Sequence, residues 1–133
     1  MVKQIIWASL AIFITWLLLD LLLHKLLLRP AYDASANLWR PMDKLNIPLI
    51  YFVMLVLIGT FVLIYSFLIE QKSLAVGIKF GVLFGLALSV SAGFGTYIHM
   101  PIPLRLAWGW FLGGLVKAVS AGAIVGLLIK RSP

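Results

Sequence analysis

The sequence predicts an all-α membrane protein whose four transmembrane helices form an antiparallel up-down bundle. Its 133 residues are 63% hydrophobic and 11% charged, which is too apolar for a soluble domain of this size to bury. The mean hydropathy of +1.11 agrees with this. Four apolar runs, at about 5–28, 47–69, 74–98 and 104–129, each reach the roughly 20 residues needed to cross a bilayer. Since no connection between them has room for a soluble domain, we expect one transmembrane domain over residues 1–133.

The first run, 5–28, is expected to be a transmembrane helix rather than a secretory signal peptide. It is longer than the apolar core of a signal peptide, and the polar side chains of Asp20 and His24 interrupt it. Pro30 is expected to end this helix. In the polar connection 29–46, residues 33–40 are predicted to form a short helix in the membrane interface, with Asp33 capping its first turn.

The remaining runs are joined by short links, a tight one at 70–73 and a proline-stiffened turn at 99–103. Antiparallel threading places both termini and the 70–73 link on one side, and the 29–46 connection and the 99–103 turn on the other. Basic residues near helix ends then number five on each side, so the positive-inside rule does not decide the orientation. They are Lys3, Lys72, Lys79, Lys130 and Arg131 on the first side, and Lys25, Arg29, Arg40, Lys44 and Arg105 on the second.

The net charge of +7 is interpreted in the same way. Because these basic residues flank apolar helices, we expect them to meet lipid headgroups rather than nucleic acid. Aromatic residues near the helix ends are typical of the membrane-interface belt. They are Trp7, Trp39, Tyr51, Trp108 and Trp110. The expected partners are therefore the lipid bilayer and either further copies of the chain or another membrane protein.

Small residues recur at helical spacing in the last two runs. One row consists of Gly77, Gly81 and Gly85, and the other of Gly114, Ala118, Gly122 and Gly126, with Gly109 and Gly113 on a neighbouring row. Such rows let two helix backbones approach closely in lipid. Two interpretations stay open: the last two helices pack together within one chain, or one row forms an interface between subunits.

Ionisable residues within the apolar runs are the candidate functional residues. Asp20 and His24 lie four residues apart and share a helix face. His99 ends the third run on the same side of the membrane, and Lys117 lies near the middle of the fourth. A charge at the bilayer centre is costly and usually faces a partner, water or a ligand. We expect these four side chains to converge in one half of the bilayer if their helices turn them inward.

Two interpretations of this group remain. Asp20 and Lys117 form a structural ion pair, with His24 an interfacial side chain and His99 a turn residue. Alternatively, the four residues line a polar pocket open to one side, suited to proton-coupled or ion-coupled binding or to an anion attracted by Lys117.

Several kinds of chemistry are disfavoured. The chain has no cysteine, which excludes disulfides, thiolate metal sites and cysteine nucleophiles. A metal held by Asp20, His24 and His99 with Met100, or a haem held by the two histidines, is a weak alternative because two histidines do not specify a site. No nucleophile–base pair or carboxylate dyad stands out, so we expect no enzymatic activity, cofactor or metal site.

Three stretches, DLLLHKLLL, LWRP and PIPLRLAWGWFLGGLVK, together resemble uncharacterised small four-helix bacterial integral membrane proteins. The resemblance spans most of the chain. It implies the four-helix architecture and a multi-pass location in the bacterial cytoplasmic membrane, and it implies no activity.

The leading functional hypothesis is a small oligomeric membrane protein that transports or conducts a small polar or ionic solute through a one-sided polar pocket. The alternative is a non-catalytic accessory or assembly subunit whose glycine rows dock another membrane protein. A haem- or quinone-binding redox subunit is a third, weaker hypothesis.

Overall fold

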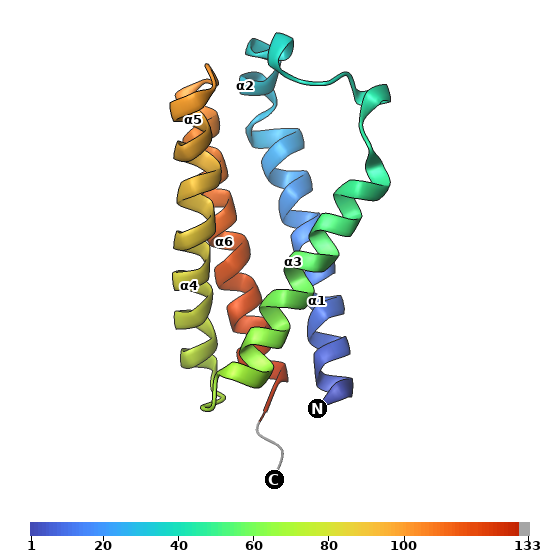
Figure 1. Ribbon diagram of the computed structural model, residues 1–133, viewed down its shortest axis with the longest axis vertical. Coiled ribbons are helices and arrows are strands. Elements are labelled where there is room, and N and C mark those ends of the chain that lie inside the picture. Colours follow the sequence, from blue (N-terminus) through green and yellow to red (C-terminus); the bar gives the residue numbers. More distant parts are fainter. Residues whose placement is uncertain (131–133) are drawn as a thin grey trace.

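The computed structural model describes residues 1–130, and these form four long antiparallel helices (Figure 1). The first comprises α1 (Val2–Asp20) and a π-helical continuation, η1 (Leu21–Leu27), and the second is α3 (Ile47–Leu68). The third comprises α4 (Leu74–Val90), a second π-helical segment, η4 (Ser91–Gly95), and α5 (Thr96–His99), and the fourth is α6 (Leu104–Leu128). All four are long and apolar enough to cross a membrane. The predicted fold class is confirmed, and the chain is a multi-pass membrane protein by helix length and hydropathy.

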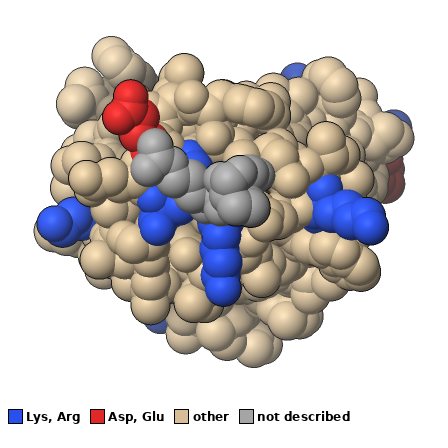
Figure 2. All heavy atoms as spheres, turned by 90° about the horizontal axis from the view of Figure 1, so that it is seen from below, with Lys and Arg blue, Asp and Glu red and all other residues tan. Residues whose placement is uncertain are grey.

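The threading of the chain is also as predicted. Figure 1 shows the N-terminus, the end of α6 and the link before α4 at one end, and α2 and α5 at the other. We call these the terminal end and the α2 end. Viewed from the terminal end, Lys and Arg side chains outnumber acidic ones (Figure 2). Arg131, which the sequence analysis counted on this side, lies outside the described residues, as does the end of the predicted domain.

The connection after η1 differs from the prediction. Its helical segments are α2 (Arg29–Ala34), η2 (Ala36–Leu38) and η3 (Met42–Lys44). Pro30 lies in the first turn of α2, where its fixed φ angle suits a helix start. Helix α2 therefore begins before Asp33, and the prediction that Asp33 caps a first turn is wrong. Its exposed carboxylate instead lies 4.0 Å from Arg29, four residues earlier.

Side chains at the terminal end join α3 to α4. Ser73 caps α4 by accepting a hydrogen bond from the Val76 amide. The Lys72 ammonium donates to the backbone carbonyls of Tyr65, Ser66 and Ile69. These carbonyls lack partners within the helix because α3 ends at Leu68. Lys72 thus caps the carboxyl end of α3 and fixes the tight turn into α4.

Helices α4 and α6 form the closest helix pair. A methyl group added at Gly77 or Gly81 would overlap the backbone carbonyl of Gly122 or Ala118, respectively. Gly85 faces the side chains of Leu115 and Ala118, and Gly126 faces the backbone of Ser73 and Leu74. Because the backbones nearly touch, the absence of side chains on these rows is what permits the contact.

The neighbouring row on α6 faces the first helix instead. A methyl group at Gly109 would overlap Leu28, and one at Gly113 would overlap Leu23. Gly114 faces Ser89 of α4. The small-residue rows of α4 and α6 are therefore covered by other parts of the same chain. This favours packing inside one subunit over the interpretation that a glycine row is a free docking surface.

The main apolar core lies toward the terminal end. Ile58, Phe61 and Tyr65 of α3 are buried there, and the Phe61 ring lies 4.5 Å and 4.9 Å from the rings of Phe80 and Phe84. In contrast, the first half of α3 diverges from α1 (Figure 1). Exposed apolar side chains in this half include Ile47, Leu49, Phe52 and Leu55. A second, smaller buried cluster lies at the α2 end and comprises Leu28, Ala31, Ile102, Leu106 and Ala107.

Candidate functional site

An ion pair joins the first and fourth helices. The Lys117 ammonium Nζ, near the middle of α6, donates to both carboxylate oxygens of Asp20 at 2.7 and 2.9 Å. Asp20 is the last residue of α1. The two side chains keep 24% (Asp20) and 20% (Lys117) of their surface exposed. The pair is thus largely withdrawn from the surface but remains accessible.

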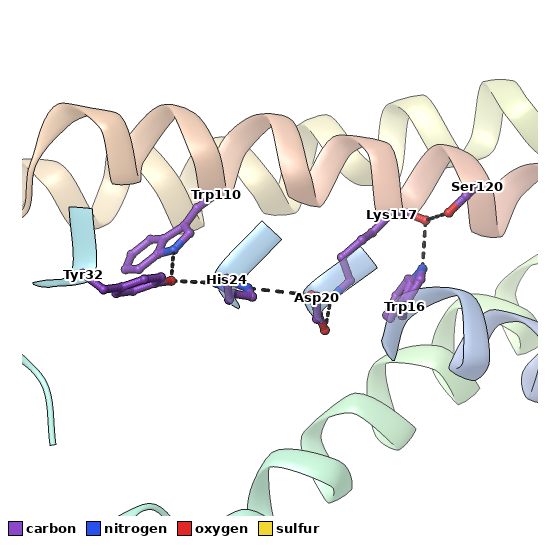
Figure 3. Close-up of polar contacts among 7 residues, drawn as sticks. All are labelled: Trp16, Asp20, His24, Tyr32, Trp110, Lys117 and Ser120. Carbon is purple, nitrogen blue, oxygen red and sulfur yellow. Dashed lines mark hydrogen bonds and ion pairs between the residues drawn. The ribbon is translucent and has the colours of Figure 1, made fainter. Parts of the chain in front are cut away.

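Further polar contacts extend this pair toward the α2 end. Figure 3 shows His24, Tyr32 and Trp110 continuing the line from Asp20. The His24 Nε2 atom lies 3.7 Å from Asp20 Oδ1, and His24 Nδ1 lies 2.7 Å from the Tyr32 hydroxyl. Trp110 Nε1 donates to the same hydroxyl at 2.7 Å. These five residues, Asp20, His24, Tyr32, Trp110 and Lys117, are called the polar cluster.

The helix backbone at Lys117 is anchored independently of its side chain. Its carbonyl oxygen accepts hydrogen bonds from Trp16 Nε1 at 2.9 Å and from Ser120 Oγ at 2.7 Å (Figure 3). The ammonium also lies 4.9 Å from the centre of the Trp16 ring, within the range of a cation–π interaction. Trp16 therefore ties α1 to α6 at the level of the ion pair.

A π-helical segment places His24 in the polar cluster. Segment η1 starts directly after Asp20, and its wider turn is marked by the bond from the Leu28 amide to the Leu23 carbonyl. Single π-helical turns inside α-helices are frequent at functional sites. Here the segment turns the end of the first helix so that His24 meets both Asp20 and Tyr32.

Two adjoining cavities border the polar cluster. The first, about 260 Å³, is lined by all five members of the cluster together with Leu23 and Gly114. The second, about 180 Å³, extends toward α3 and α4 and has a largely apolar lining. This lining includes Leu57, Phe84 and Leu88. Trp110, Gly114 and Lys117 line both cavities, so Lys117 lies where the two cavities meet.

Comparison with known proteins does not assign this chain to a family. No family model, curated protein or solved structure matches this chain. The architecture implied by the resemblance to small four-helix membrane proteins is present, and no family is identified. The site is therefore interpreted from its own geometry.

Of the four predicted site residues, the structure brings three together. Asp20, His24 and Lys117 meet, whereas His99 is exposed at the end of α5 and lines neither cavity. The expectation that His99 converges with the others is wrong. Within the described residues, no group of three or more His, Asp or Glu side chains is placed to hold a metal ion.

Sequence reasoning missed two members of the cluster. Tyr32 lies in a connection without helical periodicity, and Trp110 was assigned to the interfacial belt. Trp110 instead turns inward, where its ring and those of Tyr32 and Trp39 pack against one another. Burial raises the pKa of the Tyr32 hydroxyl above its ordinary value of about 10, so it remains a protonated donor near neutral pH.

We predict that Tyr32→Phe destabilises the fold. It removes the acceptor of Trp110 Nε1 and the partner of His24 Nδ1, and each polar group left without a partner costs about 1–3 kcal/mol. Thermal unfolding in detergent measures the effect. Tyr97→Phe is the matched control because Tyr97 is 43% exposed, and an equal change in both variants would contradict the prediction.

Proposed function

We propose that the protein binds a small polar or ionic solute in the pocket at the polar cluster and, as an oligomer, transports it across a bacterial cytoplasmic membrane. The observation that carries this proposal is the partly exposed Asp20–Lys117 pair at the junction of the two cavities. Intramembrane ionisable residues commonly mark substrate or ion pathways.

Buried apolar clusters lie toward both ends of the pocket. The hydrogen-bonding groups run from Lys117 toward the α2 end, where Tyr32 and Trp110 pack against a small buried cluster that includes Leu28, Ala31 and Leu106, whereas the main apolar core lies toward the terminal end. That core includes Ile12, Phe61, Val62 and Val125, all fully buried. The pocket is therefore a dead end within one chain, and complete passage requires either a change in helix packing or a second copy. This is the basis for proposing an oligomer.

The accessory-subunit hypothesis has less support. It relied on the glycine rows as a docking surface, and α4, α6 and the end of the first helix cover these rows within the chain.

Uptake into proteoliposomes tests the proposal. Radiolabelled glycine, lactate and choline represent a zwitterion, an anion and a cation. We expect at least one of them to enter parent proteoliposomes faster than empty liposomes, and we expect Lys117→Met to remove this excess. Lys79→Met is the control because it removes an exposed ammonium of α4. Uptake by Lys117→Met equal to that of the parent, or no excess uptake by the parent, would overturn the proposal.

A further inference from the structure

The hydrogen bonds of the polar cluster have a defined direction. Trp110 Nε1 is only a donor, so the Tyr32 oxygen accepts from it. The single Tyr32 hydroxyl proton is then free to be donated to His24 Nδ1. In neutral His24 the ring proton accordingly resides on Nε2, which faces Asp20. The indole thus selects one tautomer of the histidine.

The charge of the cluster depends on His24 alone. The groups that face this ring are Asp20 from its own helix, Tyr32 from α2, and Trp110 and Lys117 from α6. Tyr32 remains a neutral hydroxyl, and the described residues of α3 and α4 contribute no charged side chain to the lining of either cavity. One carboxylate and one ammonium cancel, so the cluster is neutral with neutral His24 and carries one positive charge when His24 is protonated.

Protonation of His24 also frees two hydrogen-bond donors. The new Nδ1 proton is donated to Tyr32, whose own hydroxyl proton must then turn toward the cavity. Imidazolium also competes with Lys117 for Asp20, because Nε2 and Nζ face the same oxygen, Oδ1. An ammonium proton and a hydroxyl proton are then available to a ligand in the cavity that Lys117 and Tyr32 line. An uncompensated positive charge in a poorly solvated site favours binding of an anion.

We infer that this pocket binds a small monocarboxylate with a short apolar tail together with one proton. The carboxylate lies against Lys117 and Tyr32, and the tail occupies the apolar cavity beside Phe84 and Leu88. The proton comes from water and binds to His24, and no bond of the ligand is made or broken. Because the two charges compensate each other, proton binding and anion binding each strengthen the other. This inference rests on the proposed function and names its substrate class.

Calorimetry of the full chain in lipid nanodiscs tests the inference with three probes of equal chain length, butyrate, butylamine and butanol. We expect butyrate to bind most tightly of the three probes. Its binding should be about tenfold weaker at about pH 8 than at about pH 6, because His24 carries a proton less often at the higher pH. In weakly buffered solution at about pH 8, roughly one proton should be taken up per butyrate bound, since His24 is the one group that changes charge.

Variants assign the proton to His24. His24→Gln should abolish both the pH dependence and the proton uptake, whereas His99→Gln, which alters an exposed histidine, should retain both. Equal binding of the three probes, or butyrate binding without proton uptake, would overturn the inference. If butyrate does not bind while solute uptake still depends on Lys117, the inference fails and the proposed function stands.

Discussion

Gly122→Ala should lower the free energy of unfolding by about 3 kcal/mol, because overpacking of a filled contact costs this much when neighbouring groups cannot move. The added methyl group would overlap the backbone carbonyl of Gly77, and a backbone atom in a helix cannot yield as a flexible side chain does. Gly77→Ala should have a similar effect, since its methyl group would meet the carbonyl of Gly122. Helices α4 and α6 would have to separate along their length.

Unfolding by SDS titration in mixed micelles measures this loss. Gly59→Ala is the matched control: it is also a glycine inside a transmembrane helix, but its added methyl group meets no atom within 4 Å. Its stability should equal or slightly exceed that of the parent, since alanine is the better helix former. Equal stability of Gly122→Ala and Gly59→Ala would show that α4 and α6 do not pack as described.

Asp20→Asn should destabilise the protein by roughly 3 kcal/mol, because removal of one partner leaves a charge withdrawn from water without compensation. The Lys117 ammonium donates to both carboxylate oxygens of Asp20. In the variant, the negative charge of this carboxylate is absent. The double variant Asp20→Leu/Lys117→Met should instead lie within about 1 kcal/mol of the parent, since replacing both charges by apolar groups is often neutral.

The same SDS titration, applied to the parent, Asp20→Leu, Lys117→Met and the double variant that combines them, completes a double-mutant cycle. Asp33→Asn is a suitable control because the Asp33 side chain is 74% exposed. Additive losses in the cycle would mean that Asp20 and Lys117 do not act as a pair.

The long elements were predictable because they depend on composition. Runs of apolar residues predicted the four helices to within a few residues. The small-residue spacing favoured close packing of the last two helices without excluding an interface between subunits. The depth of Lys117 and Asp20 in antiparallel helices placed the two side chains within reach of each other, and the structure shows that they meet. Each of these predictions uses a regular period or a length, which the sequence displays directly.

The rest depends on local departures from that regularity. A π-helical turn holds more residues than an α-helical one and rotates everything that follows. Segment η1 turns His24 toward Tyr32, and segment η4 precedes His99, which is exposed rather than turned toward the other three candidate residues. The leucine-rich composition of η1 carries no signal for this. Tyr32 was missed because an irregular connection offers no period from which to infer its direction.

The double variant Asp20→Leu/Lys117→Met also provides the most direct test of the claim that the polar cluster is a solute site. Its uptake of glycine, lactate and choline into proteoliposomes should be compared with that of the parent, after both proteins have been shown to unfold at similar SDS fractions. If the ion pair serves binding, the stable double variant takes up solute no faster than empty liposomes. Uptake at the parental rate by a stably folded double variant would contradict this account and assign the pair a purely structural role.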